Sequence, residues 1–158
     1  MQIIIKKFPD AILKIIVGFN KYTKSLKKLA QDLNISSNAM FYNSQQDLRS
    51  FYSNASLYFM TSSSESFPFV LAESKAYGLA NIVTGKEYLV LTKKGFIFVK
   101  DNDYEEMAYK AIELFSNMTC LREQGKSARE SLNIFLPEKV DLRYKNLYES
   151  LMNGTSKE

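Results

Sequence analysis

The sequence of 158 residues contains no histidine and no tryptophan, and it has one cysteine, Cys120. Without histidine, the chain cannot build a Ser-His-Asp or Cys-His catalytic site, and it cannot bind a metal through imidazole. A single cysteine excludes an internal disulfide and a cysteine cluster for zinc. Any chemistry of this chain must therefore come from carboxylates, lysines, hydroxyl groups and backbone dipoles.

The sequence also lacks an uninterrupted apolar run of the roughly 18 residues that a membrane-spanning helix needs. Residues 1–19 are rich in apolar side chains, but Lys6, Lys7, Asp10 and Lys14 interrupt them. No small-residue cleavage site follows this start, so it does not have the organisation of a signal peptide.

Basic residues outnumber acidic ones, which gives a formal net charge of +4. Small clusters occur at Lys24, Lys27 and Lys28 and at Lys93 and Lys94. Such clusters are typical of a solvated surface, and they would equally attract phosphate-bearing ligands or the anionic face of a membrane. Because the basic residues form no organised stripe, we expect no nucleic-acid partner. We expect a cytoplasmic protein, and the basic clusters leave open a location at the membrane surface.

Short apolar runs rich in β-branched and aromatic residues alternate with segments of helical periodicity. Most of these runs are nearly continuous, as is typical of strands that are covered on both faces. The alternation predicts an α/β domain with a mostly parallel, Rossmann-like sheet, helices on both faces and right-handed crossovers. The predicted strands are residues 12–18, 39–43, 56–60, 80–85 and 96–99.

Helical segments lie between and after these strands. Leu26, Leu29, Ala30 and Leu33 keep the i, i+3, i+4, i+7 spacing, and Asn34 marks a stop. Beyond the last strand the pattern is helical throughout, and residues 1–152 are expected to form one domain before a disordered tail at 153–158. Further helices are predicted around Leu48–Tyr52, after Pro68 and before Gly78, after a capping box at Asp103 and Glu106, over 121–131, and after Pro137.

The most informative stretch is residues 61–83, which read TSSSESFPFVLAESKAYGLANIV. A predicted strand ends at Met60, a small polar loop follows, and a helix opens near Pro68. Ligands of parallel sheets bind at the carboxyl ends of the strands. Because a helix start directs backbone amides and a partial positive charge at this edge, the segment is suited to binding a diphosphate.

Two carboxylates, Glu65 and Glu73, flank the start of this helix. If the segment were helical throughout, they would lie about 12 Å apart along the axis, which does not suit the paired carboxylates of a glycosidase. Separate hydrogen bonds to one extended ligand fit better, since a carboxylate accepts two hydroxyl donors from a sugar diol. On spacing alone, Glu65 would equally complement the helix dipole and Glu73 would face solvent, so both interpretations stay open.

The segment resembles the signature of the retaining GT-B glycosyltransferases of the large group 1 family. Stretches on both sides are also similar to that family: residues 39–52 to the strand and loop that meet the nucleotide base, and residues 95–115 to its closing strand and helix. The similarity covers roughly residues 9 to 150, and residues 54–79 resemble capsule and surface-polysaccharide transferases of the family particularly well. The signature residues here are Ser62, Glu65, Phe67-Pro68, Glu73, Ala76, Gly78 and Ile82-Val83.

The resemblance implies a lobe that binds a UDP- or GDP-sugar and works without a bound metal or other cofactor. It implies that Glu65 is the catalytic residue, near the donor sugar, and that Glu73 binds the ribose hydroxyls. The backbone amides of Phe69 and Val70 would hold the diphosphate. The other donor-binding candidates are Ser66 and Phe67 in the same loop, and Asn43, Gln45 and Leu48 near the base.

The sequence departs from the family pattern at its start. The family opens this lobe with a strand, a Gly-Arg turn and a lysine, whose cations neutralise the diphosphate leaving group. Residues 1–8 resemble the helix that follows that lysine, and Lys6 and Lys7 do not occupy its position. Ala80 replaces a usual proline, and Asn43 stands where glycine is common. We therefore expect a lobe without its first strand, inactive alone, whose acceptor lobe belongs to a separate protein chain.

Two alternatives to an active transferase lobe are a non-catalytic relative and a dehydrogenase domain. A non-catalytic remnant or regulatory module would keep the fold, with or without nucleotide affinity, but would transfer nothing. A Rossmann-like dehydrogenase domain is disfavoured because no G-x-G-x-x-G motif opens a helix. The residues do not distinguish UDP from GDP, nor do they identify the sugar or the acceptor.

Overall fold

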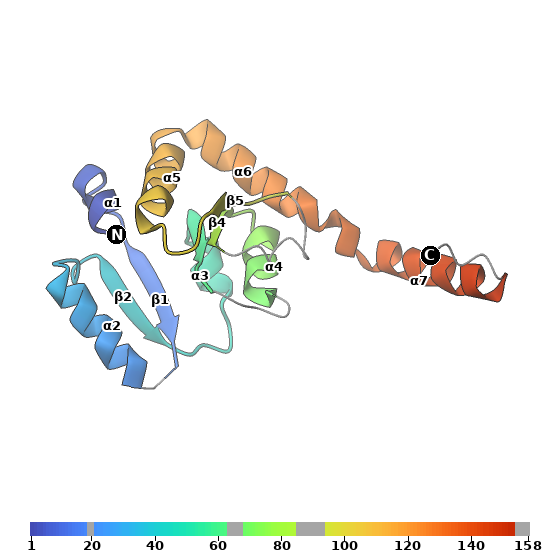
Figure 1. Ribbon diagram of the computed structural model, residues 1–158, viewed down its shortest axis with the longest axis horizontal. Coiled ribbons are helices and arrows are strands. Elements are labelled where there is room, and N and C mark those ends of the chain that lie inside the picture. The colour runs from blue at the N-terminus through green and yellow to red at the C-terminus, as the bar shows by residue number, and fades with distance from the viewer. Residues whose placement is uncertain (19–20, 63–67, 85–93, 154–158) are drawn as a thin grey trace.

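The computed structural model describes residues 1–18, 21–62, 68–84 and 94–153. In these ranges the strands form two parallel sheets, and the helices lie around them (Figure 1). In one sheet β1 (Leu13–Val17) pairs with β2 (Ala39–Asn43). In the other, β4 (Ala80–Thr84) lies between β3 (Leu57–Met60) and β5 (Ile97–Val99). The predicted parallel α/β architecture is confirmed, with every predicted strand present.

The helices follow the order that the hydrophobic periodicity predicts. Helix α2 lies between β1 and β2, α3 between β2 and β3, and α4 between β3 and β4, the alternation that is typical of α/β folds. The helices are α1 (Gln2–Lys7), α2 (Lys21–Asp32), α3 (Arg49–Ser53), α4 (Phe69–Ala76), α5 (Tyr104–Ser116), α6 (Met118–Glu130), the 3-10 helix η2 (Ser131–Phe135) and α7 (Pro137–Met152).

Several helix ends lie where their local sequence predicts them. Asn34, just beyond α2, has a left-handed φ of 53°, and Gly78, just beyond α4, has a φ of 71°. Such residues terminate helices because they adopt the left-handed conformation at little cost. At the start of α5, a side-chain oxygen of Asp103 accepts a hydrogen bond from the Glu106 amide at 2.9 Å, as an N-cap residue does.

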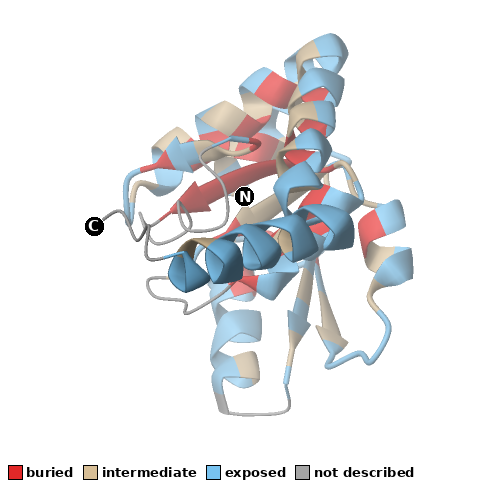
Figure 2. Cartoon of the chain, turned by 90° about the vertical axis from the view of Figure 1, so that its right-hand side faces the viewer, coloured by how far each residue is buried: buried red, intermediate tan, exposed pale blue. Residues whose placement is uncertain are grey.

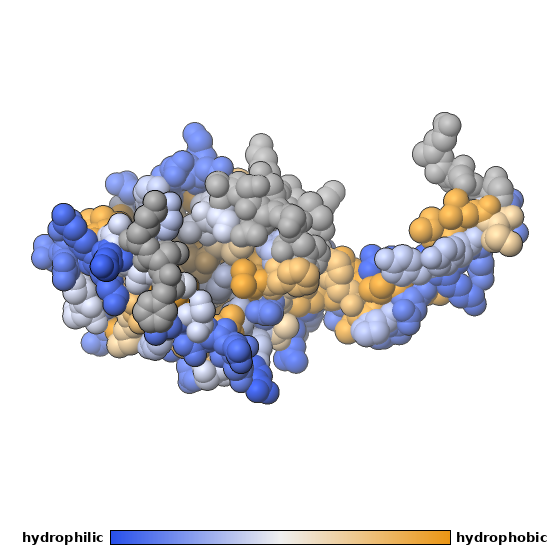
Figure 3. All heavy atoms as spheres, turned by 90° about the horizontal axis from the view of Figure 1, so that it is seen from below, coloured by the Kyte–Doolittle hydropathy of each residue, from blue (hydrophilic) through white to orange (hydrophobic). Residues whose placement is uncertain are grey.

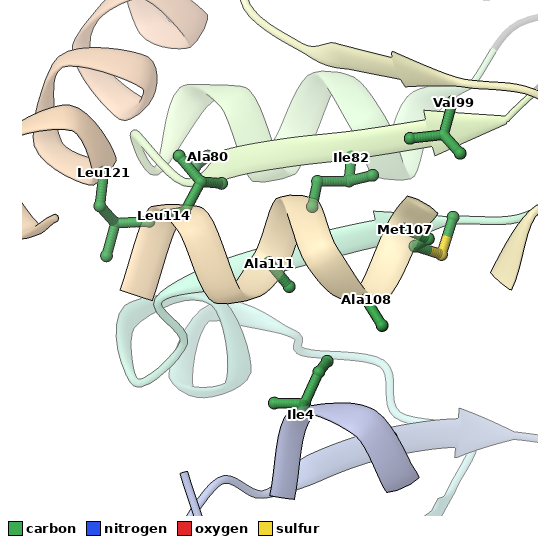
Figure 4. Packing of buried hydrophobic residues seen from close by; sticks show 9 residues of the cluster. All are labelled: Ile4, Ala80, Ile82, Val99, Met107, Ala108, Ala111, Leu114 and Leu121. Atoms are coloured by element: carbon green, nitrogen blue, oxygen red, sulfur yellow. The ribbon is translucent and has the colours of Figure 1, made fainter. Parts of the chain in front are cut away.

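The core is centred on β4, whose residues are all buried (Figure 2). Ile82 packs in a cluster with Ala111 and Leu114 of α5, whereas Val83 packs in a second cluster with Leu71 of α4. Neighbouring residues of one strand thus belong to clusters on opposite faces, because side chains alternate along a strand. Figure 4 shows the first cluster, in which α5 lies along β4.

Helix α1 packs against both sheets. Ile4 is buried in the cluster that contains Ala80 and Ile82 of β4, next to α5 (Figure 4). The next residue, Ile5, packs on the cluster formed by Ala30, Ile35 and Ala39 beside the first sheet. Because consecutive residues of α1 contact different clusters, this short helix lies across the boundary between the two sheets.

Two features differ from a fully covered α/β domain. Strands β1 and β2 are only partly buried, although their nearly continuous apolar sequences predict strands covered on both faces. Helix α7 has no buried residue and projects from the rest of the chain (Figures 1 and 3). Among the described residues, no helix is both long and apolar enough to cross a membrane.

Candidate functional site

The start of α4 lies at the carboxyl end of β3, as the sequence predicts. Pro68 is the N-cap residue, and its carbonyl accepts hydrogen bonds from the amides of Leu71 at 3.0 Å and Ala72 at 3.1 Å. The amides of Phe69 and Val70 therefore lie in the turn that precedes these first helical bonds. Both residues are exposed, so the positive end of the helix dipole faces the surface at this edge of the sheet.

Glu73 lies one turn further along α4 and is exposed. The Tyr52 hydroxyl of α3 donates a hydrogen bond to Glu73 Oε2 at 3.0 Å, and it also lies 3.4 Å from the Val70 carbonyl oxygen. A carboxylate has about four acceptor positions, so one hydrogen bond from tyrosine leaves capacity for further donors. Glu73 thus lies on the same face of the helix as Val70, and the Tyr52 hydroxyl holds one of its oxygens.

Tyr52 is held in place by aromatic neighbours. It is buried, its ring stacks on Tyr77 with centroids 5.3 Å apart, and it also contacts the ring of Tyr58 at 6.2 Å. Burial raises the pKa of the Tyr52 hydroxyl, and the hydrogen bond to the negative Glu73 carboxylate raises it further. The hydroxyl therefore stays protonated at neutral pH and remains a donor to Glu73.

The loop between β2 and α3 carries the candidates for the nucleotide base. Asn43 ends β2, and the Gln45 side-chain amide donates to the Asn43 carbonyl at 2.9 Å. Leu48 is the N-cap residue of α3, the helix that also carries Tyr52. Since α3 contacts α4 through Tyr52, the structure connects the base-side candidates with Glu73 through one short helix.

Lys75 of α4 is fully buried and faces away from this site. Residues two apart on a helix point in nearly opposite directions, about 200° apart, so Lys75 and Glu73 lie on different faces. The Lys75 ammonium donates to the Lys94 carbonyl at 2.9 Å and lies 4.8 Å from the centre of the Phe96 ring. Burial lowers the pKa of Lys75 to about 8. Through these two contacts, Lys75 connects α4 with the segment that leads into β5.

The remaining site candidates, Glu65, Ser66 and Phe67, lie outside the described residues. The catalytic assignment of Glu65 therefore stays a prediction from the sequence. The described residues contain no group of three or more cysteine or carboxylate side chains that could hold a metal ion. Sequence reasoning missed the contact of Tyr52 with Glu73, because the only local signal was an aromatic residue at helical spacing from Leu48.

Comparison with known proteins identifies the family. The family model described as "Glycosyl transferases group 1" matches residues 1–131. The chain belongs to this family. An "Uncharacterized glycosyltransferase" of Haemophilus influenzae is 34% identical over 120 residues, which are 73% of this chain and 33% of that protein. The chain thus spans about a third of the length of this relative.

Solved structures show that the fold is that of a GT-B lobe. The C-terminal domain of the group 1 protein LpcC from Francisella tularensis has a TM-score of 0.72 at 18% identity, covering 83% of this chain and 72% of that chain. The Anabaena protein HepE in complex with UDP has a TM-score of 0.79 at 15% identity, covering 95% of this chain and 45% of that chain. At these identities the similarity concerns the fold alone.

Proposed function

We propose that this chain is the donor-binding lobe of a glycosyltransferase and binds a nucleotide-diphosphate sugar for transfer to a glycan or lipid-linked acceptor. The observation that carries this proposal is Glu73, an exposed carboxylate oriented by Tyr52 one turn beyond the start of α4. A ribose diol would donate to the Glu73 carboxylate, while the diphosphate would accept from the amides of Phe69 and Val70. Family membership and the UDP complex of HepE support the nucleotide as ligand.

The roles of the other residues follow from their places along one extended ligand. The loop of Asn43, Gln45 and Leu48 would contact the base, because α3 joins it to Glu73. Glu65, which precedes α4 by a few residues, would approach the donor sugar. The resemblance implies a retaining transferase without a bound metal, and this too is part of the proposal.

The acceptor would bind to a second lobe, which we propose belongs to a separate polypeptide. The exposed apolar side chains of α7 support such a partner, because an amphipathic helix normally covers its apolar side by packing. Tyr144, Leu147 and Leu151 lie on one side of this helix, and each is more than half exposed. The helix has no net charge, which favours a protein surface over an anionic membrane as its partner. Its three positive residues are Lys139, Arg143 and Lys145, and its three negative residues are Glu138, Asp141 and Glu149.

Calorimetric titration of the purified chain with UDP, GDP and ADP tests the donor site. We expect saturable binding of one nucleotide, and Glu73→Ala should weaken it by about 1–2 kcal/mol, as loss of a charge-assisted hydrogen bond does. Glu123→Ala on the exposed side of α6 is the matched control and should leave affinity unchanged. Absence of binding at millimolar nucleotide would favour a non-catalytic remnant instead.

Activity of the isolated chain is a separate test. Without the acceptor lobe, we expect no transfer from UDP- or GDP-sugars to any acceptor, because GT-B reactions take place between two lobes. Measurable turnover by the pure chain would contradict the proposed need for a partner, even if nucleotide binding were as expected.

A further inference from the structure

The first residue of α4, Phe69, is an exposed aromatic residue at the carboxyl end of β3. Its side chain is 69% exposed, compared with 36% for Val70 and 41% for Tyr77 at the other end of the helix. Phenylalanine is not a favoured helix former, and the chain itself buries little of this ring. A large apolar side chain at this position therefore adds little to the stability of the fold.

The geometry of the helix determines which side of α4 carries Phe69. Leu71 is fully buried, and successive residues of an α-helix are rotated by about 100°. Phe69 precedes Leu71 by two residues, so it lies on the opposite, outer side of the helix. Glu73 lies on the same outer side and is a neighbour of Phe69, because residues four apart on a helix face the same way.

Along the helix axis, the Phe69 ring lies closer to the start of α4 than the Glu73 carboxylate does. Side chains of a helix tilt toward its N-terminus, and the two residues are separated by about one turn, or roughly 5.4 Å. The Tyr52 hydroxyl holds the carboxylate at the level of Val70, because it lies 3.4 Å from the Val70 carbonyl oxygen. The ring of Phe69 therefore lies beside the first amides of α4, on the far side of them from Glu73.

This order of groups matches the order of groups in a nucleotide-diphosphate sugar, in which the diphosphate joins the ribose to the sugar. With the ribose on Glu73 and the diphosphate on the amides of Phe69 and Val70, the sugar would follow in the direction of the Phe69 ring. One face of a hexopyranose consists of C–H groups, whose positively polarised hydrogens suit the negative face of an aromatic ring. Ligand sites commonly combine such an aromatic wall with a few polar groups.

We propose that the side chain of Phe69 stacks on the sugar of the donor, and that this sugar is a hexopyranose. The inference rests on the proposed function, from which it takes the positions of the ribose and the diphosphate. The side chain and the backbone of Phe69 then have different ligands. Every substitution except proline keeps the amide of residue 69, so the contact with the sugar can be separated by mutation from the contact with the diphosphate.

Calorimetric titration with UDP and UDP-glucose, and with GDP and GDP-mannose, tests this contact. The quantity compared is the affinity for the nucleotide sugar divided by the affinity for the nucleotide alone. Phe69→Ala should lower this ratio about 2- to 12-fold, the usual effect of an aromatic contact, and leave the affinity for the nucleotide alone unchanged. Phe69→Tyr keeps the ring and should keep the ratio. Circular dichroism and the thermal midpoint show that each variant is folded.

Nuclear magnetic resonance of the bound nucleotide sugar gives a second readout, because a proton above the face of an aromatic ring is shifted upfield. We expect upfield shifts of the sugar C–H protons with the natural chain and with Phe69→Tyr. These shifts should be absent with Phe69→Ala and with Phe69→Leu, which keeps an apolar side chain without a ring. Tyr109→Ala, which removes an exposed ring from α5, is the matched control and should change neither the shifts nor the affinity ratio.

Three results would overturn the stacking of Phe69 on the sugar. They are an unchanged affinity ratio in Phe69→Ala, sugar proton shifts that persist in that variant, and an equal loss of affinity for the nucleotide and the nucleotide sugar, which would place the ring on the ribose or the base. In each case the natural chain still binds a nucleotide, so the donor site is retained. Binding of neither UDP nor GDP by the natural chain would reject the donor site and this contact together.

Discussion

The Tyr52 hydroxyl donates to Glu73 Oε2 at 3.0 Å and joins α3 to α4. Glu73 is exposed, whereas Tyr52 is 7% exposed and stacks on Tyr77. A buried donor of this kind restricts the rotamers of a surface carboxylate before any ligand binds. Such preorganisation improves affinity because less side-chain freedom is lost on binding. Tyr52 is thus a positioning residue for the proposed ribose contact.

Tyr52→Phe should weaken UDP binding about 2- to 12-fold. It keeps the ring but frees Glu73, whose side chain must then be ordered on binding at a cost of roughly 0.5–1.5 kcal/mol. Calorimetric titration measures the change. In the Glu73→Ala background the same substitution should have little further effect, since the two residues act through one contact. Tyr104→Phe, which removes an exposed hydroxyl on α5, is the control. Equal losses in both backgrounds would show that Tyr52 acts only on the fold.

Gly125→Ala should destabilise the chain by about 1–3 kcal/mol, the usual cost of overpacking. Alanine would ordinarily stabilise a helix relative to glycine by about 1 kcal/mol. In α6, however, a Cβ at residue 125 would overlap the carbonyl oxygen of Gly78, in the turn that ends α4. Denaturant unfolding measures the change, and the exposed Arg122→Ala on the same helix should shift stability by less than about 0.5 kcal/mol. A gain in stability for Gly125→Ala would contradict this close packing.

The sequence predicts the strands and most helix ends because their signals are local. Asn34, Gly78 and Asp103 act within a few residues of the chain, and the structure confirms all three positions. The Tyr52–Glu73 contact joins residues 21 positions apart, and nothing local distinguishes Tyr52 from an ordinary core aromatic. The partial exposure of β1 could not be predicted from the sequence either. An apolar pattern indicates that a strand suits the interior of a sheet, but it does not show whether a neighbouring strand lies on each side.

Lys75→Met should remove a pH dependence of stability. The folded-state pKa of Lys75 is lowered to about 8 from an ordinary value of 10.5. Between these values the unfolded chain binds more protons than the folded chain, so stability rises with pH. The cost of burying the ammonium is fully present below pH 8 and is lost as the pH approaches 10.5. The free energy of unfolding of the natural chain, relative to that of Lys75→Met, should therefore increase between about pH 8 and pH 9.5.

Lys139→Met is the control for this measurement, because Lys139 is exposed on α7. Every other titratable group is present in both the natural chain and Lys75→Met, so its contribution cancels in the comparison. An unchanged difference between the natural chain and Lys75→Met across the window would mean that the Lys75 ammonium is not buried as the structure places it.

Removal of residues 137–158 should leave the free energy of unfolding within about 0.5 kcal/mol of the natural value, as surface changes do. Helix α7 has no buried residue, and its main contact with the rest of the chain is η2. The same truncation should weaken binding to the proposed polypeptide that carries the acceptor lobe, because Leu147 and Leu151 present the apolar side that a partner would cover. Thermal unfolding and co-purification measure the two effects separately.

Leu147→Ser in the full-length chain refines this comparison. It removes one apolar contact from the exposed side of α7, whereas Lys145→Ser changes the polar side of the same helix. If α7 binds in the groove of a protein partner, Leu147→Ser should weaken this binding and Lys145→Ser should leave it unchanged. A membrane would respond to both, because the apolar side and the basic residues each contribute to binding anionic vesicles. Vesicle flotation that depends on Lys145, without any effect of Leu147 on the protein complex, would assign α7 to the membrane surface and remove it from the lobe interface.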